Sequence, residues 1–154
     1  MNAIEIAGYF DSRYRSDTGR RIDEMKLHKL LYLAQRESLV RHMQPLFQDD
    51  IYAWRFGPVV SSVRTAYRRN EIPYCGISGM SMETRDILNY VYDQYSRKSS
   101  WSLSRLTHME GSWRSARARR CGGGGHRLIP IQDIKNDAMR LAQRRETLKE
   151  FGLV

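Results

Sequence analysis

Apolar residues recur at helical spacing along most of the chain. The clearest case is residues 23–43, where good helix formers carry an apolar stripe at positions i, i+3, i+4 and i+7: Leu27, Leu30, Leu31 and Ala34. This spacing places the four side chains on one helix face, and Asp23 is a suitable residue to cap the helix start. We predict that this helix forms the centre of the core.

Other segments also show a helical pattern, a capping residue, or both. Helices are expected over residues 2–15, from Ser61 or Ser62, from Ser81, over residues 101–108, from a cap at Ser112, and from about Gln132 to Glu150. Near residues 50–56 the pattern changes to alternating side chains rich in aromatic residues, which favours a short strand broken by Gly57-Pro58. The sequence therefore predicts a mainly α fold: a single compact helical domain over residues 1–154 with a small β element.

The composition narrows the class of protein. A chain of 154 residues with 41% hydrophobic residues is long enough for one core. It has no apolar run near the roughly 20 residues of a membrane span and no signal-peptide pattern at its start, so we expect a cytoplasmic protein with no membrane partner. The formal net charge of +9 favours a polyanionic partner, either nucleic acid or an acidic protein surface, although a merely solvated basic surface stays equally open.

The residues that most often carry chemistry form no recognisable site. The four histidines, His28, His42, His108 and His126, are scattered along the chain. Only His126 lies close to a cysteine in the sequence, in the run "CGGGGH". Zinc sites use closely spaced ligand pairs, so no metal is expected, and Cys75 and Cys121 are expected to be free thiols. The glycine-rich residues 121–126 lack the spacing of a phosphate-binding loop, which predicts a flexible loop and no cofactor.

The stretch "RLTHMEGSW" at residues 105–113 places a histidine near a carboxylate, as a catalytic site would. The chain contains no GxSxG nucleophile motif, and no pair of carboxylates stands out as catalytic. We therefore interpret His108 and Glu110 as the break between two helices, expect no catalytic residue, and predict that the protein is not an enzyme.

Two arginine clusters are the best candidates for binding a partner. Arg114, Arg117 and Arg120 share one face of a predicted helix, and Trp113 precedes them. A second cluster consists of Arg64, Arg68 and Arg69, of which Arg64 and Arg68 are the candidate contacts. Arginine and tryptophan are enriched where proteins bind partners, whereas the alternative is a solvated helix face beside a core tryptophan.

Three separated motifs carry a family resemblance. They are "KLHKLLYLAQ" at 26–35, "PLFQDDIYAWRFGPVV" at 45–60 and "LTHMEGSWRSAR" at 106–117. In this order they resemble the Panacea domain of the SocA-like antitoxins, a family carried by phages, prophages and mobile elements, whose motifs read KLxKLLYYAQ, PLF…AWxxGPV and THxxxxW. The chain departs from them at His28, Leu33 and Gly111-Ser112, and "CGGGG" matches no family pattern.

The resemblance implies a mostly helical antitoxin with no cofactor and no catalytic mechanism. Such a protein binds and neutralises a toxin encoded beside it, and in the SocA type it also delivers the toxin to a cellular protease. The matching residues are expected to specify the fold: Lys26, Leu30, Tyr32, Gln35, Trp54, Gly57, Pro58, Thr107 and His108. Gly57-Pro58 would form a turn, Trp54 and Trp113 would anchor the core, and His108 would cap helix carbonyls.

Two functions follow from these observations. The first is an antitoxin that neutralises its cognate toxin by direct protein–protein binding. The alternative is a small basic phage protein that binds nucleic acid or regulates expression, which the arginine clusters and Trp113 favour. The two functions are compatible, and binding to nucleic acid is expected to be secondary.

Overall fold

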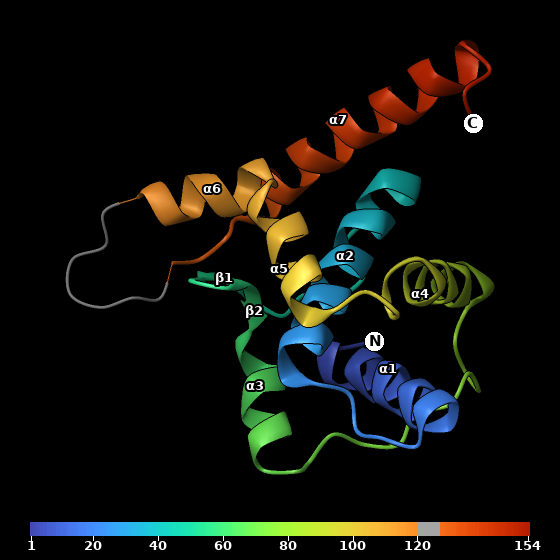
Figure 1. Ribbon diagram of the computed structural model, residues 1–154, viewed down its shortest axis with the longest axis vertical. Coiled ribbons are helices and arrows are strands. Elements are labelled where there is room, and N and C mark those ends of the chain that lie inside the picture. Colours follow the sequence, from blue (N-terminus) through green and yellow to red (C-terminus); the bar gives the residue numbers. More distant parts are fainter. Residues whose placement is uncertain (120–126) are drawn as a thin grey trace.

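A computed structural model describes residues 1–119 and 127–154 of the chain. Within these residues it contains seven helices and one antiparallel β-hairpin (Figure 1). In chain order the elements are α1 (Ala3–Thr18), α2 (Glu24–His42), β1 (Ile51–Trp54), β2 (Gly57–Val60), α3 (Ser61–Arg68), α4 (Met82–Tyr95), α5 (Ser100–His108), α6 (Gly111–Ala118) and α7 (Ile131–Glu150). The prediction of a mainly α fold with a small β element is confirmed. The predicted flexible loop at 121–126 lies outside the described residues, as do Cys121 and His126.

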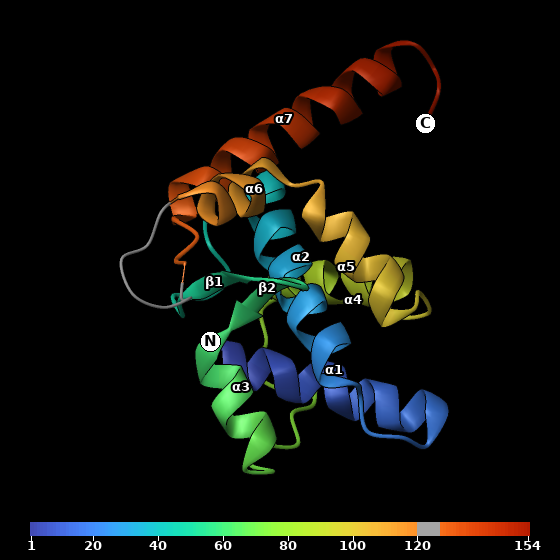
Figure 2. The ribbon, with the colours of Figure 1, turned by 60° about the vertical axis from the view of Figure 1, so that its left-hand side comes forward.

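Helix α2 runs through the middle of the molecule, with α1 on one side and α7 on the other (Figure 2). Its residues from Lys26 to Leu39 are all buried, and it contacts α1, α3, α4, α5, α7 and β2. The helix starts where predicted, because the Asp23 side chain accepts a hydrogen bond from the Lys26 backbone N–H at 3.1 Å. The prediction of a central core helix over this segment is confirmed.

The local caps at Asp23 and Ser81 were predicted correctly, whereas the local cap of α5 at Ser99 was not predicted. Ser81 accepts a hydrogen bond from the Thr84 backbone N–H at 3.1 Å, as expected. The predicted cap at Ser112 is wrong, since α6 already begins at Gly111 and no side chain from the preceding residues caps it. Asp137 of α7 takes over this role and accepts from the Ser112 N–H at 2.8 Å. A carboxylate from another helix thus stabilises the positive end of α6.

The β element differs from the prediction in one respect. Gly57-Pro58 does not end the strand, because these residues begin β2, where Gly57 pairs with Trp54 and Pro58 pairs with Ala53. The turn consists of Arg55 and Phe56. In a two-residue hairpin the residues flanking the turn form the hydrogen-bonded pair, so Pro58 falls at a non-bonded position where its missing N–H costs no ladder bond.

The opposite edge of β1 is covered by the segment that leads into α7. The Ala53 N–H donates to the Arg127 carbonyl at 2.7 Å, and the Ile129 N–H donates to the Ile51 carbonyl at 2.8 Å. Helix α7 then packs on α2 through Ile134 and Ala138, which are buried as predicted. Its predicted inner residues Leu141 and Leu148 are only partly covered, because the helix extends past the other elements toward the C-terminus (Figure 1).

Candidate functional site

The outer edge of β2 is closed by two side chains of α2. The Lys29 ammonium donates to the Pro58 carbonyl at 3.2 Å, and the Val60 N–H donates to His28 Nδ1 at 3.2 Å. Both side chains are buried, and burial lowers the pKa of Lys29 to about 8 and lowers the pKa of His28. Because these side chains satisfy the free backbone groups of β2, this edge does not recruit a further strand. Residues of the first motif thus hold the second motif in place.

Helix α5 holds the turn of the hairpin. The Ser104 hydroxyl donates to the Phe56 carbonyl at 2.6 Å. Gly57 lies against α5 with φ +116°, and a Cβ added there would lie 2.8 Å from Thr107 Oγ1 and 2.6 Å from Lys29 Cε. Only glycine fits this backbone conformation and this space. Gly57 of the second motif therefore packs closely against Thr107 of the third motif.

His108 and Trp113 hold the end of β1 next to the turn of the hairpin. Their rings stack with centroids 4.1 Å apart and planes 19° apart, and the Trp113 indole N–H donates to the Trp54 carbonyl at 3.0 Å. Helix α5 does end at His108, but its C-cap is Met109. The expected capping role of His108 is therefore replaced by stacking on Trp113. Trp54 and Trp113 are both only partly buried, so they line the edge of the core rather than fill it.

The remaining residues of the first motif also act inside the fold. Gln35 fixes the loop after α2, since its amide donates to the Phe47 carbonyl at 2.8 Å and accepts from the Leu46 N–H at 2.7 Å. The buried Lys26 ammonium donates to the Ser96 carbonyl at 2.7 Å, and Leu30 is fully buried. Lys26, Leu30 and Gln35 are therefore all engaged inside the molecule.

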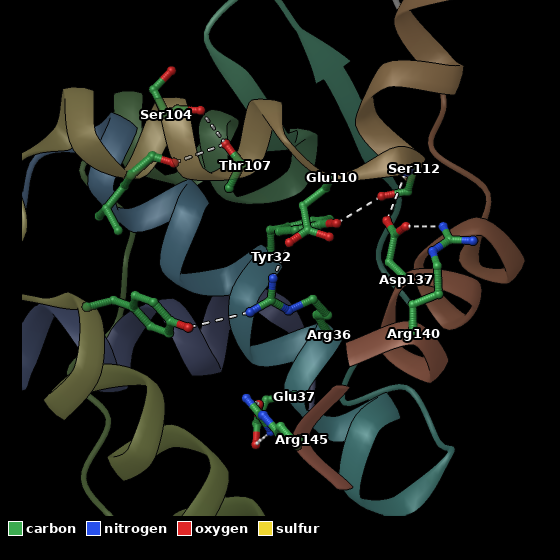
Figure 3. A network of polar contacts seen from close by, with 12 residues as sticks. Tyr32, Arg36, Glu37, Ser104, Thr107, Glu110, Ser112, Asp137, Arg140 and Arg145 are labelled. Atoms are coloured by element: carbon green, nitrogen blue, oxygen red, sulfur yellow. Dashed lines mark hydrogen bonds and ion pairs between the residues drawn. The ribbon is translucent and has the colours of Figure 1, made fainter. Parts of the chain in front are cut away.

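A polar network joins α2, α6 and α7 on the other side of α6 (Figure 3). Tyr32 and Ser112 share a hydrogen bond of 2.8 Å, and Ser112 leads to Asp137, which pairs with Arg140 at 2.6 Å. Beside it, Arg36 pairs with Glu110. Burial raises the pKa of Glu110, although the neighbouring guanidinium opposes this effect.

His108 and Glu110 thus face different partners. The His108 ring stacks on Trp113 beside the hairpin, whereas the Glu110 carboxylate binds Arg36 of α2. Each group already has a structural contact, which supports the interpretation of "RLTHMEGSW" as a junction between helices. In the described part of the chain no three His, Cys, Asp or Glu side chains are grouped to hold a metal ion, and no helix is long and apolar enough to cross a membrane.

The structure places the two arginine clusters on different elements. Arg64 and Arg68 extend from α3 to Glu24, with nitrogen–oxygen distances of 3.0 and 3.6 Å. Arg114 and Arg117 of α6 donate to the carbonyls of His108 and Ala53 at 3.1 and 3.4 Å. Arg120 lies outside the described residues.

The sequence reasoning missed an exposed aromatic pair. Phe56 at the hairpin turn and Trp101 on α5 meet edge to face, with ring centroids 5.3 Å apart. Both side chains are exposed. No signal in the sequence indicated this pair, since Phe56 fell at the end of the predicted strand and that pattern predicts no contact with a residue 45 positions away.

The sequence model of the family described as antitoxin SocA-like, Panacea domain, matches residues 27–114, more than half of the chain. The chain belongs to the SocA-like antitoxin family. The matched span runs from α2 to the first turn of α6 and includes the hairpin and the contacts that hold it. No curated protein and no solved structure matches the chain.

Proposed function

We propose that this Panacea-domain protein neutralises a protein toxin by binding it directly, without catalysis. The observation that carries the proposal is the family match over residues 27–114, which coincides with the three motifs assembled around one hairpin. These motif residues are engaged in internal hydrogen bonds and packing. Residues held in this way build a rigid scaffold, and a rigid scaffold suits binding because little conformational freedom is lost on association.

The charge of the chain supports an acidic partner. A net charge of +9 accelerates encounter with a negatively charged protein surface and adds specificity. The arginines of α3 and α6 are proposed contacts, namely Arg64, Arg68, Arg114 and Arg117, together with Arg120. Trp113 is proposed to contribute through its ring edge, because its N–H is already bonded to the hairpin.

Co-expression tests this proposal. The protein encoded by the neighbouring open reading frame is induced in a bacterial host with and without the chain, and growth and co-purification are measured. We expect the neighbour to arrest growth, and the chain to restore it and to co-purify in a salt-sensitive complex. A chain that neither restores growth nor co-purifies would contradict the proposal. A mobility-shift assay over a salt series tests the alternative, since a shift without toxin binding would assign the basic surface to nucleic acid.

A further inference from the structure

Phe56 and Trp101 form an apolar patch on the surface of the protein. Phe56 is 43% exposed and Trp101 is 60% exposed, and their rings lie almost perpendicular at 88°. Aromatic side chains dominate the energetics of protein interfaces when a partner covers them. An exposed pair that the fold itself holds together is therefore a candidate anchor for a partner.

A cleft of about 380 Å³ opens beside this pair. Its walls include Met25, Trp54, Phe56 and Val59, and the buried side chains of His28 and Lys29 contribute to its lining. We call this cleft, together with Phe56 and Trp101, the hairpin-tip surface. Its size and mostly apolar walls suit one or two side chains of a partner rather than an extended strand, because Lys29 and His28 already satisfy the β2 edge.

The hairpin-tip surface is held in place before any partner arrives. Ser104 bonds the Phe56 carbonyl, Trp113 bonds the Trp54 carbonyl, and Gly57 is packed between Lys29 and Thr107. Preorganisation of this kind lowers the entropy cost of binding. A hairpin without such contacts would have to order its tip on association.

The charges around the surface are mainly positive. The cleft is lined by three cationic side chains, Lys29, Arg55 and Arg64, and by one carboxylate, that of Glu24, which already pairs with Arg64 at 3.0 Å. Arg55 lies over the Phe56 ring, and Arg105 follows Trp101 by one helical turn on the exposed side of α5. Neither Arg55 nor Arg105 forms an ion pair with a carboxylate in the described residues. Two arginines beside an apolar cleft complement a partner that carries carboxylates.

We propose that the hairpin-tip surface is the docking site for the toxin, and that it receives an apolar side chain flanked by acidic residues. This inference rests on the proposed function. A nucleic-acid strand fits less well, because consecutive bases stack on ring faces that run parallel, whereas Phe56 and Trp101 are perpendicular.

Single substitutions of the exposed aromatic residues test the site. Phe56→Ser and Trp101→Ser each remove a partly exposed ring, and Arg55→Glu reverses a charge at the exposed tip. Tyr74→Ser is the matched control, since Tyr74 is 88% exposed on a different part of the surface and does not line the cleft. Each variant is compared with the wild type for rescue of growth from the neighbouring toxin, for affinity by titration calorimetry, and for folding by circular dichroism.

We expect each aromatic substitution and Arg55→Glu to weaken toxin binding roughly tenfold or more, with folding unchanged, while Tyr74→Ser binds like the wild type. If all variants neutralise the toxin like the wild type, the docking site is wrong and the proposed function stands. If the wild type itself neutralises nothing, the proposed function fails and this inference with it. The wild type and the variants are also compared in a mobility-shift assay with a single-stranded oligonucleotide. If Phe56→Ser and Trp101→Ser abolish oligonucleotide binding but still bind the toxin, the surface belongs to nucleic acid and the proposal is overturned.

Discussion

Replacing Gly57 with alanine tests how tightly the hairpin is fitted to the helices around it. Gly57 has φ +116°, and holding an alanine in such a sparsely populated conformation costs about 1–3 kcal/mol. The new methyl group would also lie 2.6 Å from Lys29 Cε and 2.8 Å from Thr107 Oγ1, closer than nonbonded atoms tolerate. Neither neighbour moves freely, because the Lys29 ammonium is bonded to Pro58 and Thr107 is fully buried. Overpacking of this kind costs about 1–3 kcal/mol more.

The two effects together predict a loss of about 4 kcal/mol in the free energy of unfolding, measured by urea denaturation followed by circular dichroism. Gly19→Ala is the matched control. Gly19 also has a positive φ of +73°, but a Cβ there meets no atom within 4 Å, so only the backbone strain of about 1–2 kcal/mol applies.

The difference between the two variants isolates the steric contacts of Gly57. If Gly57→Ala costs no more than Gly19→Ala, the hairpin is not clamped between α2 and α5 as described. A large difference together with a normal circular dichroism spectrum would support the close packing of the three motifs.

Three further predictions concern other contacts of the core. Gln35→Leu leaves buried backbone groups of the loop after α2 without partners, so we expect a loss of about 3 kcal/mol by urea denaturation, and a loss below about 1 kcal/mol would contradict the described hydrogen bonds. Lys29 has a folded-state pKa of about 8 against about 10.4 when unfolded. Between these values the unfolded state binds more protons, so stability rises with pH, and relative to Lys29→Met the wild type should gain about 2.5 kcal/mol from pH 8 to 10.5. A pH-independent difference between the two proteins would refute the lowered pKa. Arg145→Ala removes a two-pronged ion pair with the buried carboxylate of Glu37 and should speed hydrogen exchange in the second half of α7, whereas the exposed Lys149→Ala should not.

Much of the fold could be predicted because its determinants are local. The stripe at i, i+3, i+4 and i+7 lies within α2, and the caps Asp23 and Ser81 directly precede the helices that they cap. The start of α6 could not be predicted, because its acceptor is Asp137, 25 residues further along the chain. The position of the turn was wrong for a similar reason: Gly57-Pro58 is typical of turns, and its place in a strand depends on pairing with β1 and packing on α2 and α5.

In the candidate site, too, the sequence indicated roles for residues within its motifs but not contacts between distant segments. The motif residues were expected to be structural, and in the structure Lys26, Lys29 and Gln35 donate to backbone carbonyls inside the molecule. The arginines and Trp113 were chosen from their spacing on one helix, which carries no information on what each side chain contacts in three dimensions. Phe56 and Trp101 had no sequence signal as a pair, since they meet only when α5 packs against the hairpin.

The hairpin explains how one fold could serve different partners. In the motif AWxxGPV the named positions correspond to Ala53, Trp54 and residues 57–59, which are paired, bonded or packed inside the molecule. The two unspecified positions are Arg55 and Phe56, and these form the exposed turn. Substitutions at the turn would therefore alter the charge and shape offered to a partner while the Ser104 hydroxyl still bonds the backbone carbonyl of residue 56. A change at Phe56 would also remove its ring contact with Trp101 of α5. If the toxin docks at the hairpin-tip surface as proposed, an antitoxin built in this way can change its toxin while its core stays fixed.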